Sequence, residues 1–274
     1  MNPNEIDALI KKITFSKKYR SMGIPQETLQ DLFMQEMERH NKEGDAIQAV
    51  KGKLHNIMAP YLGDLEYPEA SQTLEATLAS RDKEAIAALC TLFLKGHHST
   101  AERLPYANSF YAYIFSQMDG TCSVLDLACG LNPFFLGLID LPTALTYTAF
   151  DIHAPRIRLI AQLFAGDIGV MGNAETRDIL VRPPQEHVDA VFLFKEAHRM
   201  EKRRSGATRD LIAALNAKHI FLSLPNRSLN GRFDLSERMM RLVEGSIEGL
   251  KLRLSTKEFQ SETLYHLEKP HGKT

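Results

Sequence analysis

The sequence lacks several features that mark common classes of protein. It has no apolar run as long as a membrane span, no internal repeat and no low-complexity segment. Its first residues, Met1-Asn-Pro-Asn-Glu5, do not resemble a signal peptide. Lys and Arg together number 33 against 34 Asp and Glu, which gives a net charge of −1. A uniformly basic, nucleic-acid-binding surface is therefore excluded, and positive charge for RNA must be local.

Cysteine is also scarce. The three cysteines, Cys90, Cys122 and Cys129, are odd in number and have no metal-site spacing. Two of them lie in apolar segments, so we expect buried free thiols in a reducing cytoplasm. The adjacent histidines His97 and His98 have no partner ligands at metal spacing, so we expect no metal site.

The Gly-x-Gly-x-x-Gly fingerprint of dinucleotide-binding proteins is absent as well, although a related pattern is present. The segment 123–133 begins with an apolar run typical of a buried parallel strand and ends on Ala128-Cys-Gly130, where a chain can turn sharply. A second apolar run, 146–150, ends at Asp151, an acid suited to ribose hydroxyls. The looser form Asp126-x-Ala-x-Gly130 favours S-adenosylmethionine and a methyltransferase over an ordinary buried strand and turn.

Residues 1 to about 95 show helical spacing. The pattern predicts helices near 6–13, 25–37, 46–58, 70–79 and 82–95. Two interpretations of this region stay open: a solvated helical cap, or a docking module for RNA phosphates. The basic side chains for docking would be Lys11, Lys12, Lys17, Lys18 and Arg20.

The rest of the chain alternates between strands and helices. Strands are predicted at 123–128, 146–151, 168–173, 188–194 and 218–225, and helices at 133–140, 154–165 and 205–216. Period-two patterns at 250–255 and 263–269 predict a terminal hairpin. The expected fold is α/β, a class I S-adenosylmethionine-dependent methyltransferase with a Rossmann-like seven-stranded sheet. We place an N-terminal helical domain at 1–104 and the methyltransferase domain at 105–274.

A set of motifs, in order over about residues 14–232, resembles the aminoglycoside-resistance 16S rRNA (guanine-N7) methyltransferases. The motifs are Ser16-Lys-Lys-Tyr19, His97-x-Ser-Thr-x-Glu-Arg103, Asp126-Leu-Ala-Cys-Gly-Leu-Asn-Pro133, Asp151-Ile-His153, Arg177-Asp178, Phe194-Lys195 and Ser223-Leu-Pro-Asn-Arg-Ser-Leu-Asn-Gly-Arg232. Two segments depart from the family pattern. Glu196-Ala-His-Arg199 replaces an apolar pair that is often followed by proline, and the segment from Phe233 replaces Gly-Met-Glu and an aromatic-rich helix.

The resemblance implies a role for each motif. Arg103 would pair with the carboxylate of S-adenosylmethionine, Asp151 would bind its ribose and Asp178 its adenine amino group. The predicted cofactor-binding residues are His97, Thr100, Arg103, Asp126, Ala128, Gly130, Asn132, Asp151, Ile152, Asp178, Ile179, Phe194 and Lys195. The predicted catalytic residues, placed at phosphates or at guanine O6, are Lys195, Arg227 and Arg232. Without the resemblance, Ser99 and Glu102 would be read as a helix capping box.

The implied reaction transfers a methyl group from S-adenosyl-L-methionine to guanine N7 in the decoding site and leaves S-adenosyl-L-homocysteine. It would act on 16S rRNA within the assembled 30S subunit and confer aminoglycoside resistance, as a cytoplasmic monomer with no membrane contact. N7 carries a lone pair and no proton, so positioning suffices and no general base is needed. A basic rim would hold the RNA backbone while the base flips out. Its residues would be Arg199, Lys202, Arg203, Arg204, Arg209, Arg227, Arg232, Arg238 and Arg241.

Three alternatives stay open. The first is a class I methyltransferase acting on another RNA site or a small molecule, which the two divergent segments favour. The second is a binding protein that kept the fold without catalysis. The third, a dehydrogenase, is disfavoured by the missing glycine fingerprint.

Overall fold

A computed structural model describes residues 3–14, 19–59, 63, 65–118, 122–142, 144–228 and 233–270. Within these residues seven strands form one sheet in the order β3-β2-β1-β4-β5-β7-β6. Strands β1 to β5 are parallel, and β7 pairs antiparallel with both β5 and β6. The strands are β1 Cys122–Leu127, β2 Leu145–Asp151, β3 Met171–Thr176, β4 His187–Phe194, β5 Asn216–Pro225, β6 Arg253–Glu258 and β7 Glu262–Glu268.

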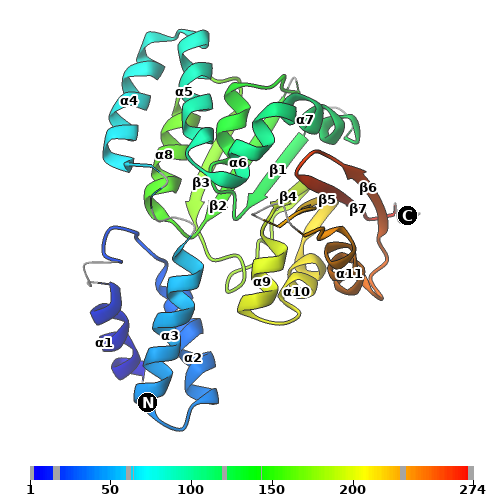
Figure 1. Cartoon of the computed structure of the whole chain (residues 1–274). Helices are drawn as coiled ribbons and strands as arrows, with labels where there is room; N and C mark the ends of the chain where they lie inside the picture. The colour runs from blue at the N-terminus through cyan, green and yellow to red at the C-terminus, as the bar shows by residue number, and fades with distance from the viewer. Residues whose placement is uncertain are drawn as a thin grey trace.

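Helices precede and connect these strands (Figure 1). Before the sheet come α1 Pro3–Thr14, α2 Gln26–Arg39, α3 Glu43–Met58, α4 Tyr67–Ser80, α5 Lys83–Lys95, α6 His98–Arg103, η2 Leu104–Tyr106 and α7 Ala107–Ser116. Between the strands, along the chain, come η3 Asn132–Gly137, α8 Ala154–Ala165, α9 Ala197–Arg203, α10 Ala207–Ala214 and α11 Ser236–Ile247. In the described part of the chain, no helix combines the length and hydropathy that a bilayer crossing needs.

Both faces of the sheet are buried, because side chains of a strand alternate between them. Along β4, Ala190 and Phe192 belong to the core cluster under α4, α5, α7 and α8, whereas Val191 and Leu193 belong to the cluster under α9, α10 and α11. The predicted buried free thiols are confirmed for Cys90 and Cys129. Burial raises the pKa of Cys90 to about 12, so this thiol stays protonated.

The first three helices have an apolar core of their own. Residues of α1, α2 and α3 pack together with the segment 19–24, and Ile152 reaches this core from the end of β2. The segment 19–24 packs closely against the start of α8, because the Ala154 N–H donates to the Met22 carbonyl at 3.2 Å. At Gly23, where φ is +56°, an added Cβ would lie 2.6 Å from the Ala154 Cβ. Helices α4 to α7 share the core of the sheet, so this division does not coincide with a boundary after residue 104.

Most predicted elements are present, with corrections at particular places. The helix at 154–165 has the predicted bounds, and the hairpin strands begin at Arg253 and Glu262. The helix predicted at 133–140 is a 3-10 turn over Asn132–Gly137, and the weak strand near 168–173 is β3 over Met171–Thr176. The capping box is wrong, because α6 has His97 as its N-cap and no side-chain cap. Helices α9 and α11 were not predicted.

Candidate active site at the carboxyl edge of the sheet

The site lies where the sheet changes direction. Strands β1 and β4 are neighbours, but the chain continues from β1 towards β2 and from β4 towards β5, so the loops after them separate. Such a switch point is where open α/β sheets bind ligands. Each loop begins with a non-glycine residue in the left-handed region, Ala128 at φ +51° and Lys195 at φ +56°. Strain of about 1–3 kcal/mol at such a residue is commonly found at functional sites.

A cavity of about 620 Å³ opens at this point. Ala128, Asp151 and Glu196 line it from the sheet, and Lys53 and Ile57 line it from α3. Its volume is in the range of pockets that hold a small molecule or cofactor. The wall from α3 was not predicted, because nothing in the local pattern of 46–58 indicates what the helix faces.

Asp151 connects the turn after β1 with the end of β2. One carboxylate oxygen accepts from the Gly130 N–H at 2.9 Å, and the other accepts from the His153 N–H at 2.9 Å. The side chain is buried, and the Arg156 guanidinium lies 3.8 Å away. Asp151 and its neighbour Ile152 both line the cavity, and their contact with a ribose stays a prediction.

Asp178 follows β3 and lies beside Ile179 in the cavity wall. Its Oδ1 accepts from the Leu180 N–H at 3.0 Å, and its Oδ2 lies 2.7 Å from the Arg203 guanidinium. Arg203 also pairs with Asp31 of α2 at 2.9 Å. Sequence reasoning placed Arg203 on an RNA-facing rim; its side chain instead joins the helical bundle to the cavity wall.

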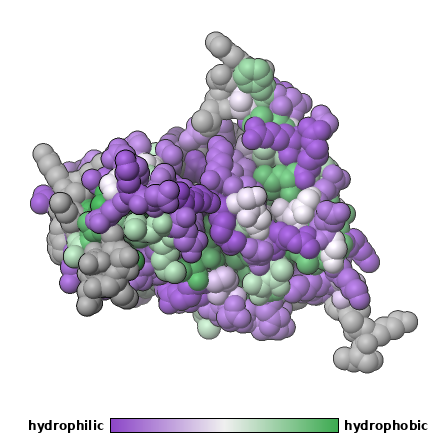
Figure 2. All heavy atoms as spheres, turned by 90° about the horizontal axis from the view of Figure 1, so that it is seen from below, coloured by the Kyte–Doolittle hydropathy of each residue, from purple (hydrophilic) through white to green (hydrophobic). Residues whose placement is uncertain are grey.

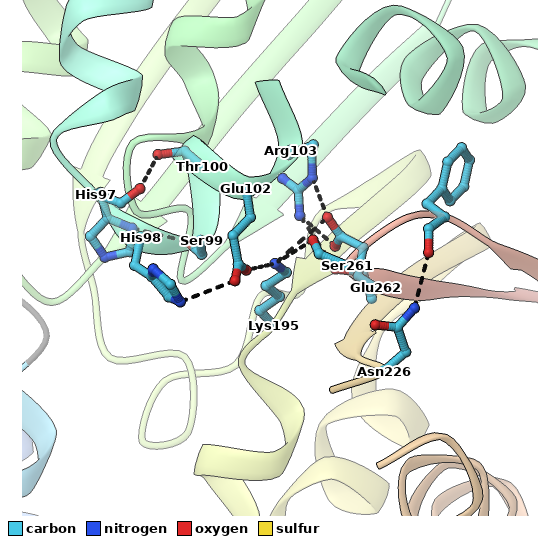
Figure 3. A network of polar contacts seen from close by, with 12 residues as sticks. His97, His98, Ser99, Thr100, Glu102, Arg103, Lys195, Asn226, Ser261 and Glu262 are labelled. Atoms are coloured by element: carbon cyan, nitrogen blue, oxygen red, sulfur yellow. Dashed lines mark hydrogen bonds and ion pairs between the residues drawn. The ribbon is translucent and has the colours of Figure 1, made fainter. Parts of the chain in front are cut away.

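Arg103 lies at the centre of a buried polar network (Figure 3). Its Nε and Nη2 donate to the two oxygens of Glu262 at 2.8 and 2.7 Å, and Nη1 donates to Asn132 Oδ1 at 2.7 Å. The guanidinium also lies 4.5 Å from the Phe110 ring centre and 4.7 Å from that of Phe194. The bidentate pairing predicted between Arg103 and the methyl donor would require Glu262 to give up this geometry.

Glu262 was missed by sequence reasoning. It lies at the start of β7, 159 positions from Arg103, in a segment that reads only as an edge strand. Burial alone would raise the pKa of Glu262, but the charge of Arg103 outweighs it and the pKa is lowered. The carboxylate is therefore ionised, and it fixes both the position and the charge of Arg103.

Asp126 and Asn132 extend the hydrogen-bond network of Arg103. Asp126 Oδ2 accepts from Asn132 Nδ2 at 2.8 Å and from the Tyr147 hydroxyl at 2.6 Å. Burial raises the pKa of Asp126 to about 7. Both side chains are buried and contact Arg103 or Tyr147; neither lines the cavity. This geometry gives them a role in holding the turn after β1.

Lys195 and Glu102 form an ion pair beside this network. The Lys195 Nζ lies 2.6 Å from Glu102 Oε2, and the other Glu102 oxygen lies 3.0 Å from the His98 ring (Figure 3). Phe194, just before Lys195, stacks on Phe192 at 5.0 Å. The amine at the end of β4 is thus held towards α6 by a carboxylate, which also explains why Glu102 does not cap the helix.

Known ribosomal RNA methyltransferases are similar to this chain in sequence. The family described as ribosomal RNA methyltransferase (FmrO) matches residues 15–251. The chain belongs to this family. It is 33% identical to the 16S rRNA (guanine(1405)-N(7))-methyltransferase of Frankia casuarinae over 69% of this chain and 68% of that protein. With the Serratia marcescens enzyme of the same name it shares 31% identity, over 83% of each chain.

Solved structures of ribosomal RNA methylases resemble the whole chain. The 16S rRNA methyltransferase RmtF in complex with S-adenosyl-L-homocysteine is 28% identical, with a TM-score of 0.75 over 98% of this chain and 99% of that one. The 16S rRNA methylase RmtB is 25% identical, with a TM-score of 0.72 over 98% of this chain and 100% of that one. The predicted class I methyltransferase fold and the predicted family are thereby confirmed.

In this ribosomal RNA methyltransferase, His97 and Thr100 secure α6. The His97 ring is 2.9 Å from the Ser99 hydroxyl, and the Thr100 hydroxyl donates to the Leu94 carbonyl at 2.7 Å. Neither residue lines the cavity. These contacts position the helix that carries Glu102 and Arg103, and a direct contact with the cofactor stays a prediction for both.

The basic residues of the methyltransferase are divided between the cavity and its rim. Arg227 is exposed beside Asp234, and Arg232 lies outside the described residues. The pKa of His198 is lowered to about 4 by burial and by the nearby charges of Arg199, Lys202, Arg238 and Lys195. Cations from β4, α9 and α11 therefore converge around His198. The described residues contain no group of three or more metal-ligating side chains.

Proposed function

We propose that this protein transfers the methyl group of S-adenosyl-L-methionine to N7 of a guanine in the decoding site of 16S rRNA. One observation carries the proposal. The cavity at the β1–β4 switch point lies between Ala128 and the two acids Asp151 and Asp178, in a chain of the ribosomal RNA methyltransferase family. The relatives that carry the guanine(1405)-N(7) name support the choice of nucleotide.

The cavity fits the methyl donor in size and in the kind of groups around it. It is large enough for an adenosine with its amino-acid arm, at about 620 Å³. At Gly130, φ is +57° and an added Cβ would meet only the Arg156 side chain, at 3.7 Å, so backbone can approach a ligand there. Asp151 and Ile152 would hold the ribose, and Asp178 and Ile179 the adenine. Arg103, Asp126 and Asn132 would hold the turn that receives the amino-acid arm.

The reaction requires guanine N7 and the sulfonium methyl group to be held in line. The bound donor supplies an electrophilic methyl group on a sulfonium, and guanine N7 supplies a lone pair with no proton to remove. The chain's own residues then hold the base in line and exclude water. Because the methylated ring gains positive charge, a cation at N7 would slow transfer. We therefore place Lys195, Arg227 and Arg232 at O6 or at phosphates.

The rRNA would be held by the cations around His198 and by the neighbouring rim. Arg199 and Lys202 come from α9 and line the cavity, and Arg238 comes from α11; all three are exposed. The face seen in Figure 2 is largely hydrophilic, with only small hydrophobic areas between polar ones. The local cations Arg199, Lys202 and Arg238 suit a polyanion. We propose that the protein acts as a cytoplasmic monomer on assembled 30S subunits, that its α1–α3 bundle docks on rRNA, and that methylation confers aminoglycoside resistance.

Methyl transfer to purified 30S subunits tests this function. Lys195→Ala, Arg227→Ala and Arg232→Ala are each expected to lower the rate at least 10-fold. Arg227→Ala and Arg232→Ala are expected to keep binding of S-adenosyl-L-homocysteine. The matched control is Arg253→Ala, which removes an exposed arginine on β6, at the far edge of the sheet. Expression of the wild type in a drug-sensitive bacterium should give high resistance to kanamycin and gentamicin. Sensitive cells and unmethylated subunits would refute the proposal.

A second target is favoured by one observation. Glu196 and His198 stand where the resembled family has apolar residues and proline, and both lie at the cavity or beside it. Methylation at another rRNA position would agree with that change. Mapping the methylated nucleotide by mass spectrometry, on 30S and 50S subunits separately, distinguishes the two targets.

A further inference from the structure

Glu196 occupies a special position in the cavity. It comes immediately after Lys195, whose left-handed backbone turns the chain at the end of β4. Its side chain lines the cavity together with Ala128 and Asp151, so it lies across the switch point from the turn after β1.

The carboxylate of Glu196 differs from the two other acids in the cavity wall. Asp151 accepts from two backbone N–H groups, and Asp178 accepts from one and pairs with Arg203. Within the described residues, no hydrogen bond or ion pair engages the Glu196 side chain. Burial raises the pKa of Glu196 to about 7, against the opposing charge of Arg199 and assisted by the negative charge of Asp151. An acid without a partner in a ligand cavity points to a positively charged or hydrogen-bond-donating ligand.

Several charged groups lie around Glu196. They come from β2, the loop after β3, α9 and α3. The charged groups that face it or share the cavity are Asp151, Asp178, Arg177, Arg199, Lys202, Arg203 and Lys53. Five of these seven are basic, and three of the five are paired with acids: Lys53 with Glu36, Arg177 with Glu175 and Arg203 with Asp178. Asp151 and Asp178 are engaged as well. Among the described acids of the cavity wall, Glu196 is the one left to pair with a cationic ligand.

We propose that Glu196 is the counter-charge for the sulfonium of the methyl donor, so that this protein binds the cationic donor in preference to its neutral thioether product. This inference rests on the proposed function. S-adenosyl-L-methionine and S-adenosyl-L-homocysteine differ by one methyl group and one positive charge at sulfur. Methyl transfer moves that positive charge from sulfur to the guanine ring. An ionised Glu196 therefore attracts the substrate and loses this attraction once the thioether has formed.

Proton linkage follows from the same geometry. A carboxyl group that titrates near neutrality is partly protonated before binding, and a cation beside it favours the ionised form. Binding of the donor near pH 7 should therefore release a fraction of a proton, and binding of the thioether should release less. Affinity for the donor should rise with pH through about 7 and then level off.

Isothermal titration calorimetry on the full-length protein tests the proposal with both ligands. Glu196→Gln removes the charge and keeps the shape. We expect it to weaken binding of S-adenosyl-L-methionine about 10-fold and to change binding of S-adenosyl-L-homocysteine less than twofold. Repeating the titrations in buffers of different ionisation enthalpy should show proton release with the wild type only. Glu237→Gln, which neutralises an exposed glutamate on α11, is the matched control.

Other results of the titrations would each contradict a different part of the proposal. Equal weakening for both ligands would make Glu196 part of the cavity wall and overturn its role as counter-charge. An unchanged ratio with unchanged affinities would overturn it as well. A wild-type protein that binds neither ligand would refute the proposed function itself. A third titration with a stable analogue bearing an amine in place of the sulfonium should follow the donor, because only the charge is shared.

Discussion

Replacing Glu262 by glutamine should unfold the protein at a much lower temperature. Glu262 and Arg103 have side-chain exposures of 0% and 2% and share two charge-assisted hydrogen bonds. Removing one charge of a buried pair costs about 3–5 kcal/mol, because the other charge is left without compensation. For a chain of this size each kcal/mol corresponds to about 2–4 °C in Tm, so the expected loss is about 6–20 °C.

Thermal unfolding followed by circular dichroism measures this loss, with urea unfolding as a second assay. The control is Glu237→Gln, which breaks an exposed pair with Arg241 and should cost less than about 0.5 kcal/mol. A double variant with Arg103→Met should be less destabilised than the sum of the two single variants. If Glu262→Gln unfolds at the same temperature as Glu237→Gln, the central role assigned to this pair is wrong.

Three further predictions concern stability. Gly172→Ala would place a Cβ 2.2 Å from the Phe164 ring, so urea unfolding should show a loss of about 1–3 kcal/mol. Asp82→Ala removes two hydrogen bonds from the side chain that caps α5 and should cost about 0.5–2 kcal/mol in the same assay. The pKa of His266 is lowered to about 4 by burial, so the unfolded chain takes up a proton first. Stability should therefore fall as the pH drops from about 6.5 towards 4, and a pH series with His266→Phe should be flatter.

Each of these results can fail in a recognisable way. A Gly172→Ala variant as stable as the wild type would mean that β3 and α8 separate easily. An Asp82→Ala variant of unchanged stability would mean that α5 is held by packing alone. A pH dependence that persists in His266→Phe would have to come from other groups that titrate in this range.

Sequence reasoning found the parts of the fold that local patterns determine. The run ending at Asp151 and the amphipathic segment 154–165 each carry their own signal, namely an apolar strand followed by an acid and a helical period. The parallel direction of the first five strands follows from the alternation of strands and helices. These features depend on residues within a few positions of one another, so a pattern can detect them.

The parts that were missed depend on contacts between distant segments. Glu262 and Arg203 gain their roles only when β7 and α9 are placed against α6 and α2. The turn at Asn132–Gly137 was read as a regular helix because its apolar residues fit either structure. Helix α9 was overlooked because it has only seven residues, too few for a helical period to stand out from a basic run. For the candidate site, the backbone turn and its acids could be predicted, whereas the partner of each charge could not.

The wall that α3 contributes to the cavity has a thermodynamic consequence. A molecule bound there touches two separately packed cores at once, so its binding energy must depend on how the helical bundle sits against the sheet. Coupling of this kind is reciprocal. If the bundle binds RNA, the bound small molecule will change the affinity for RNA. Bound RNA will change the affinity for the small molecule by the same factor.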